Sequence, residues 1–241
     1  MKCYRSQLVC AMISDGFTDD LRKREDRPLE QKKIFNIFPV YSIPPIAAML
    51  GMNCLAYFGT RIINAGRTHY NIESALDLML PVVPFFVVFY ILAFAQWIIC
   101  YILIGLQKKE YCYYFFLGEI LAKIMCLVIF LAFPTTMSRP EITGTGIFDR
   151  LLNLVYSLDA PDNLFPSIHC LESWMCWRGC RKLAGMPGWF SGANLVFTLL
   201  VFASTVLLKQ HVLIDIAGGV AAVETGLFLS ARILKTRPQQ S

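Results

Sequence analysis

Charged residues are scarce in this chain. Asp, Glu, Lys and Arg make up only 16% of its 241 residues, whereas hydrophobic residues make up 56%, and the mean hydropathy is +0.53. A soluble globular domain usually carries about 25% charged residues. The shortage of charge therefore excludes an ordinary soluble domain and indicates a polytopic membrane protein.

Paired metal-ligand motifs are also missing. The nine cysteines are scattered through or beside apolar runs, and none forms a Cys-x-x-Cys with a second pair or with histidine ligands. We therefore expect neither a zinc site nor a disulfide framework. The N-terminus has no short apolar core followed by a small-residue cleavage site, so we expect no cleaved signal peptide.

Long apolar runs are abundant. Crossing about 30 Å of hydrocarbon takes about 20 apolar residues per helix. Six runs approach that length, the fourth being shorter and more polar than the others: 38–59, 82–106, 111–133, 164–180, 189–208 and 212–232. We predict an all-α protein, a six-transmembrane-helix bundle over residues 37–234, with a polar cytoplasmic tail over 1–36 and a cytoplasmic C-terminal tail over 235–241.

The basic residues predict the orientation of this bundle. In a six-span chain with a cytoplasmic N-terminus, the basic clusters fall on one side: Arg22, Lys23, Arg24, Arg27, Lys32, Lys33, Lys108, Lys109, Arg178, Arg181, Lys182, Lys235 and Arg237. An excess of Lys and Arg marks the cytoplasmic side. The opposite face then holds the 134–163 loop, which we expect to be irregular because of its prolines and glycines, and the short connection near residue 210.

His211 and Asp215 lie at the start of the last run on that non-cytoplasmic face. Their i, i+4 spacing would place both side chains on one face of a helix. The carboxylate could then accept the imidazole N–H and strengthen the other nitrogen as a nucleophile or base. The alternative is an interfacial histidine that Asp215 merely satisfies.

His169 lies at the start of the fourth run, on the same face. Ser167, preceded by Pro166, suits the N-cap of a helix, which places His169 in the first turn, where free N–H groups favour an anion. A single histidine there is usually structural, but two histidines at the outer ends of two spans favour a site. Arg139 and Lys209 would add a forked donor and a point charge suited to a phosphate.

Three segments of this face, TTMSRP, NLFPSIHC and STVLLKQHVLIDIAGG, resemble the three motifs of the type 2 phosphatidic acid phosphatase superfamily, whose soluble relatives include vanadium haloperoxidases. The segment IESALDLMLPVVPFF resembles a sequence of small bacterial six-span members and of the sphingolipid-synthase branch. The resemblance covers roughly residues 70 to 220. It implies an integral-membrane lipid phosphatase that needs no metal and no cofactor.

The resemblance also implies roles for single residues. His211 would take the phosphoryl group, with Asp215 orienting it. His169 would protonate the leaving oxygen and later activate water. Arg139 would bind the phosphate oxygens, and the Ser167 hydroxyl or neighbouring N–H groups would complete the cradle. The expected partners are a lipid phosphate substrate and membrane lipids, with no nucleic acid, and the oligomeric state stays open.

Three positions depart from the family pattern. The expected Lys and Arg of motifs one and three are replaced by Ala132 and Thr205, and the Gly before the motif-two histidine is Ile168. The site therefore has fewer cationic residues to bind phosphate than is usual in the family. We expect Lys209 to replace it in part, and so include it among the phosphate-binding residues.

Two other functions remain open. A transferase of the sphingolipid-synthase type could use the same site to pass the phosphoryl or phospho-head group to an alcohol. Cys170, at a position where phosphatases often have Ser, slightly favours this alternative. A non-enzymatic protein could bind or transport lipid phosphates through the same polar residues. Inside the membrane, Glu119 and Lys123 are spaced to form a pair, while Glu172 could either tune His169 or bond within the bundle.

Overall fold

The computed structural model describes residues 33–34, 38–183 and 185–235. The chain divides into two compact units, Met1–Val40 and Tyr41–Ser241. In the first unit, β1 (Lys33–Ile34) pairs antiparallel with β2 (Phe38–Pro39). Apart from residues 33–34 and 235, the predicted tails over 1–36 and 235–241 lie outside the described residues.

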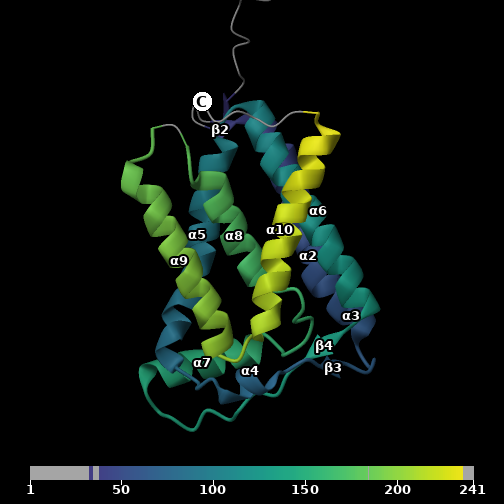
Figure 1. The fold of residues 1–241 in the computed structure, drawn as a ribbon, viewed down its shortest axis with the longest axis vertical. Helices are drawn as coiled ribbons and strands as arrows, with labels where there is room; N and C mark the ends of the chain where they lie inside the picture. The colour runs from purple at the N-terminus through teal and green to yellow at the C-terminus, as the bar shows by residue number, and fades with distance from the viewer. Residues whose placement is uncertain (1–32, 35–37, 184, 236–241) are drawn as a thin grey trace, which may run out of the picture. The chain divides into compact units, whose positions relative to one another are not determined.

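The second unit is mostly helical (Figure 1). Its helices follow the 3-10 turn η1 (Val40–Ser42) and are α2 (Ile43–Cys54), the π-helical η2 (Leu55–Gly59), α3 (Thr60–Asn64), α4 (Ala75–Met79), the 3-10 turn η3 (Pro84–Phe86), α5 (Val87–Gly105), α6 (Lys109–Ala132), α7 (Ile147–Leu158), α8 (Ile168–Cys180), α9 (Gly188–Leu207) and α10 (Leu213–Ile233). Two short strands, β3 (Tyr70–Asn71) and β4 (Thr135–Thr136), pair in parallel near the start of the loop that follows α6.

Five helical stretches of the described chain are long and apolar enough to cross a membrane: Val40–Asn64, Pro84–Gly105, Lys109–Ala132, Gly188–Leu207 and Leu213–Ile233. Large apolar side chains such as Ile62, Ile98 and Val196 are exposed on them, as expected for helices that face hydrocarbon. These features are those of an integral membrane protein. The mostly helical architecture predicted from the sequence is therefore confirmed.

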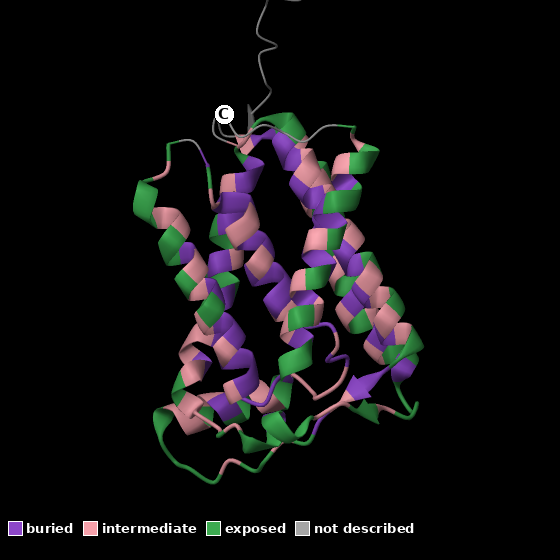
Figure 2. Cartoon of the chain, in the orientation of Figure 1, coloured by how far each residue is buried: buried purple, intermediate pink, exposed green. Residues whose placement is uncertain are grey.

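The predicted count of six spans is not confirmed, because the fourth run folds only as α8. The 13 residues of α8 rise about 20 Å, less than the thickness of a bilayer core of about 30 Å. α8 packs against α5, α9 and α10, and eight of its residues are buried (Figure 2). Polar side chains of membrane helices face the interior of the bundle, which agrees with the polar character of this sequence.

α10 and α6 pack closely at two glycines. A Cβ on Gly226 would lie 2.2 Å from the carbonyl oxygen of Gly118, and a Cβ on Gly118 would lie 3.2 Å from Leu227 Cα. Small residues let the backbones of membrane helices approach this closely. On another side α6 packs against α2, so α6 joins the first and last helices of the bundle.

A buried ionic cluster joins α6 to α8. Lys123 Nζ lies 2.8 Å from Glu119 Oε1 and 2.6 Å from Glu172 Oε1, and the side chains of all three residues are at most 4% exposed. The predicted Glu119–Lys123 pair is confirmed, and of the two roles weighed for Glu172 the structure has the bond within the bundle. A buried ammonium between two carboxylates lowers the cost that each charge would have alone in hydrocarbon.

The loop between α6 and α8 is more regular than its prolines and glycines predict. The expectation of an irregular loop is wrong for Ile147–Leu158, which forms α7. The Asp149 carboxylate accepts the Gly146 N–H at 3.1 Å and so closes the first turn. Phe148, Leu151, Leu152 and Val155 then repeat at helical spacing and pack on Val87 and Tyr90 of α5.

Adding one methyl group to Gly226 tests the close contact of α6 and α10. Gly226→Ala should lower the free energy of unfolding by about 1–3 kcal/mol, because its Cβ would collide with the backbone of α6. Gly192→Ala on α9 is the matched control, since a Cβ there meets nothing within 4 Å, and it should leave stability unchanged or raise it by up to ~1 kcal/mol. Thermal unfolding in detergent measures both, and equal effects of the two changes would contradict the packing described.

Candidate functional site

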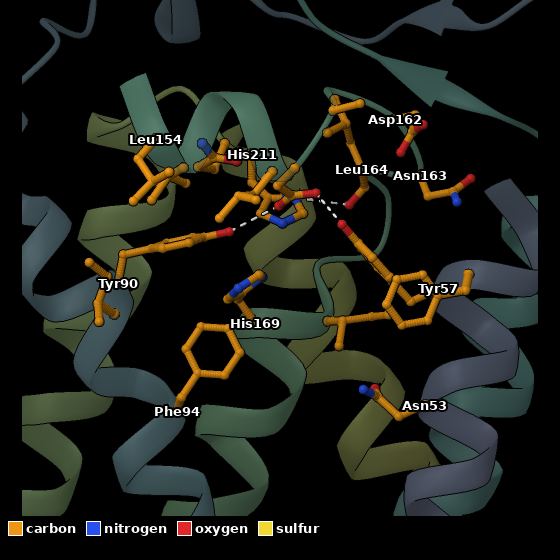
Figure 3. Close-up of a pocket in the computed structure, with 18 of the residues that line it drawn as sticks. Asn53, Tyr57, Tyr90, Phe94, Leu154, Asp162, Asn163, Leu164, His169 and His211 are labelled. Atoms are coloured by element: carbon orange, nitrogen blue, oxygen red, sulfur yellow. Dashed lines mark hydrogen bonds between the residues drawn. The ribbon is translucent and has the colours of Figure 1, made fainter. Parts of the chain in front are cut away.

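A cavity of about 500 Å³ lies beside the end of the bundle that carries α7, and it collects side chains from five parts of the chain. Figure 3 shows Tyr57, Tyr90, Phe94, His169 and His211 facing it. The remaining walls are mainly apolar and are built by Asn53, Phe58, Ile91, Trp97, Leu151, Leu154, Val155, Leu158, Asp159, Ala160, Asp162, Asn163, Leu164, Ile168 and Gln210. Both predicted catalytic histidines therefore face one apolar cavity.

α8 begins as the sequence predicts. Ser167 has an extended backbone, and its hydroxyl oxygen accepts the Cys170 N–H at 3.3 Å, which makes it the N-cap. The predicted cap is confirmed. The Ser167 side chain is fully buried, and it caps α8 rather than lining the cavity, so its role in binding phosphate stays a prediction. His169 follows in the first turn.

His169 is held by aromatic rings of α5. Its imidazole stacks on Tyr90 with ring centroids 4.4 Å apart and an interplanar angle of 26°, and the Phe94 and Trp97 rings lie at 6.0 and 5.3 Å. Its Nε2 atom is buried and has no hydrogen-bond partner. A buried imidazole nitrogen without a partner is costly in the free protein, so it is ready to bond an incoming polar group.

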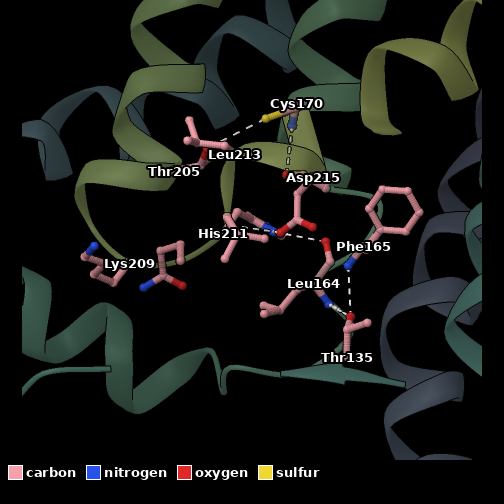
Figure 4. Close-up of polar contacts among 12 residues, drawn as sticks. Thr135, Leu164, Phe165, Cys170, Thr205, Lys209, His211, Leu213 and Asp215 are labelled. Atoms are coloured by element: carbon pink, nitrogen blue, oxygen red, sulfur yellow. Dashed lines mark hydrogen bonds and ion pairs between the residues drawn. The ribbon is translucent and has the colours of Figure 1, made fainter. Parts of the chain in front are cut away.

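His211 and Asp215 meet as predicted but not through a helix. α10 begins only at Leu213, so His211 lies in the turn before it. The His211 ring lies against the first turn of α10, where its Nδ1 is 3.0 Å from Asp215 Oδ2. The same nitrogen is 3.1 Å from the Leu164 carbonyl oxygen (Figure 4). The assumption of one helical face is therefore wrong, although the pairing it predicted is present.

The bonds of Asp215 fix the tautomer of His211. Both neighbours of Nδ1 are acceptors, so Nδ1 carries a hydrogen, and in the neutral imidazole Nε2 then carries the lone pair. The same Asp215 oxygen accepts the Val212 N–H at 3.0 Å, which closes the first turn of α10. The His169 and His211 rings lie with centroids 5.9 Å apart.

Arg139 lies behind the cavity wall. Its Nε donates to the Lys209 carbonyl oxygen at 3.1 Å, and its two terminal nitrogens donate to the Asp159 carbonyl oxygen and to Gln210 Oε1. Burial lowers the pKa of Arg139, and the Asp159 carboxylate opposes that shift. A guanidinium has five N–H donors, so this one keeps donors for an anion after these three bonds.

Lys209 points toward α4. Its ammonium donates to the Asp77 carbonyl oxygen at 2.5 Å, and the Asp77 carboxylate accepts the Leu213 N–H at 2.7 Å. Burial acts to raise the pKa of Asp77, but hydrogen bonds from Ser74 and Leu213 and the charge of Lys209 hold it below its usual value. Lys209 thus anchors α4 to the turn before α10, and its replacement of the missing cations stays a prediction.

Most cavity residues were not predicted from the sequence, and four of them carry polar groups near the histidines: Tyr57, Tyr90, Asp159 and Gln210. Tyr57 and Tyr90 lie in apolar runs, where an aromatic residue is ordinary, and Asp159 ends a loop helix that was not expected. Gln210 adjoins His211 in the sequence, so it was the one of the four whose place in the site could have been predicted. The fold, not a local pattern, brings the other three to the histidines.

No metal centre is found in the described part of the chain, where no group of three or more His, Cys, Asp or Glu side chains could hold an ion. Comparison with known proteins gives no relative, since no protein-family model, no curated protein and no solved structure matches this chain. The site is therefore interpreted from its own geometry.

Loss of the cap tests the start of α8. Ser167→Ala should lower the free energy of unfolding by about 1 kcal/mol, because the Cys170 N–H loses its acceptor inside the protein. Ser157→Ala is the matched control, since that exposed hydroxyl bonds only the Leu154 carbonyl one turn back, and it should change stability little. Thermal unfolding in detergent measures the stability of both variants, and equal stabilities would contradict the capping role.

Proposed function

We propose that the protein is an integral-membrane lipid phosphatase that removes the terminal phosphate of a lipid phosphomonoester or diphosphate through a phosphohistidine. The proposal rests on one observation above all. His211 has its Nδ1 hydrogen held by a buried carboxylate, and its ring lies 5.9 Å from His169 in the same cavity. This arrangement supplies a nucleophile, its orienting group and an acid/base.

The reaction we propose has two steps. His211 Nε2 attacks phosphorus, the N–P bond forms as the bond to the lipid oxygen breaks, and His169, protonated by the entering phosphate ester, gives that proton to the lipid oxygen. Water then attacks the phosphohistidine while His169 accepts a proton from it, and the N–P bond breaks to return the electron pair to Nε2. The lipid alcohol leaves after the first step and inorganic phosphate after the second.

The walls of the cavity support a lipid as the substrate. Several lining side chains are also largely exposed, among them Phe58 at 59%, Leu154 at 54% and Leu158 at 72%. They extend the apolar lining outward to the flank of the bundle, where acyl chains of the membrane would lie. A lipid could then keep its chains in the hydrocarbon while its phosphate reaches the histidines.

The proposed topology has six spans, with α8 as a short fourth one. α8 is too short to cross the bilayer alone, and the irregular segment 159–167 that precedes it would span the remaining thickness. Lys108, Arg178 and Arg181 lie at the ends of helices remote from the histidines (Figure 1), which favours that end as cytoplasmic. Both termini would then be cytoplasmic and the histidines would lie on the non-cytoplasmic face.

Membership of the type 2 phosphatidic acid phosphatase superfamily is part of this proposal. The three segments that resemble its motifs contribute His169 and His211, which line the cavity, and Arg139, which bonds the cavity residue Gln210. The absent Lys and Arg, at Ala132 and Thr205, are the departures that the proposal must accommodate. Lys209 and Ser167 are kept as proposed phosphate-binding residues.

Loss of the nucleophile is the direct test. His211→Ala should reduce phosphate release from a panel of lipid phosphates and diphosphates, assayed in detergent without divalent metal, to the uncatalysed background. His69→Ala is the matched control, because His69 does not line the cavity and its ring bonds the Arg67 carbonyl oxygen, and it should keep full activity. Full activity in His211→Ala would refute the mechanism.

Loss of the acid tests the role of His169. His169→Gln should slow release from a lipid phosphate by roughly 10²–10⁴-fold. The loss in the first step, followed as the initial burst of phenol release, should be much smaller with an aryl phosphate whose leaving oxygen needs no proton. An equal loss of the first step with both substrates would show that His169 is not the acid, and formation of a phosphate ester of an added alcohol would identify a transferase.

A further inference from the structure

The cavity holds a second set of polar groups that the proposed mechanism does not use. Gln210 is one of them. It is only 2% exposed, and its Oε1 accepts from Arg139. Arginine can only donate, which fixes the orientation of the amide and turns Nε2 away from Arg139. That Nε2 is buried without a partner, and Gln210 lines the cavity beside His211.

Two tyrosines complete the set. The Tyr57 hydroxyl, from η2, donates to Asp159 Oδ1, and the Tyr90 hydroxyl, from α5, donates to Asp159 Oδ2 at 3.1 Å (Figure 3). Both phenols line the cavity, and the ring of Tyr90 stacks on His169. Two hydroxyls from opposite walls thus converge on one anion next to the proposed acid.

The Asp159 carboxylate resembles a phosphate in what it offers these hydroxyls. Both are oxyanions that accept more than one charge-assisted hydrogen bond. A phosphoryl group placed between the histidines would repel the Asp159 carboxylate and compete for the same donors. Arg61 lies 4.0 Å from Asp159 Oδ1 and 3.2 Å from Asp162 Oδ2, so Asp159 has a cation beside it when the tyrosines leave.

We infer that Gln210, Tyr57 and Tyr90 are phosphate-binding residues, and that Asp159 is the internal anion that holds the two hydroxyls until a phosphoryl group replaces it. The inference rests on the proposed function for its substrate. It also explains how the chain could bind phosphate without the Lys and Arg that the family usually has at the positions of Ala132 and Thr205. The neutral donors of Gln210, Tyr57 and Tyr90 would bind part of the phosphate instead. The ligand is a phosphoryl group, whether free or on a lipid.

Equilibrium binding to the full-length protein in detergent tests this without needing turnover. The probes are radiolabelled inorganic phosphate and a short-chain phosphatidate. Tyr57→Phe and Tyr90→Phe should each weaken binding of both probes about tenfold, the lower end for a hydrogen bond to a charged group. Gln210→Glu keeps an acceptor for Arg139, removes the amide donor and should weaken binding at least as much.

Asp159→Asn should change the affinity for phosphate in the opposite direction. Removing the competing charge should tighten binding of both probes several-fold, a gain that a misfolded variant cannot produce. Tyr111→Phe is the matched control, because that buried hydroxyl bonds the Gly179 carbonyl oxygen at 2.7 Å near the far end of α8, and it should bind like the parent. If binding is unchanged in both tyrosine variants, or weaker in Asp159→Asn, the inference is wrong.

Turnover of the same preparations separates the two proposals. A parent protein that binds phosphate through these donors but releases none from any lipid would refute the proposed function and keep this inference. A parent protein that turns over lipid phosphates while both tyrosine variants bind and react like Tyr111→Phe would refute the inference alone.

Discussion

The carboxylate of Asp215 connects the fold of this protein to its chemistry. One of its oxygens accepts the Val212 N–H, which starts α10, and the same oxygen accepts the His211 Nδ1 hydrogen. Because the side chain is fully buried, both bonds form away from water, where they hold the ring most firmly. The direction of His211 is thereby tied to the position of the last helix of the bundle.

The position of that helix depends in turn on α8 and α6. α10 packs against both of them, touching α6 at Gly118 and Gly226 and α8 through Gly219, where a Cβ would lie 2.8 Å from the Ser167 carbonyl oxygen. The Ser167 N–H donates to the Asp215 carbonyl oxygen at 3.2 Å. The starts of the two histidine-bearing segments are thus bonded directly to each other, so the spacing of the histidines follows from backbone contacts.

Most of the local structure could be predicted from the sequence, with α7 as the exception. Apolar run length predicted the five long helices, and Ser167 with Pro166 before it predicted the cap of α8. The i, i+4 pairs predicted that His211 meets Asp215 and that Lys123 meets Glu119. The short α8 could not be predicted as buried, because its burial depends on three neighbours. Tyr57, Tyr90 and Asp159 come together only in the fold, since they are separated by long stretches of chain and carry no motif.

The central claim is that His211 carries the phosphoryl group, and the most direct measurement is to find it there. A lipid phosphate should be mixed with the protein, the reaction stopped within milliseconds at alkaline pH, where phosphohistidine survives, and the peptides examined by mass spectrometry. The account predicts a phosphate on His211 that forms and decays during turnover. Turnover at the normal rate with phosphate on another residue, or on none, would contradict it.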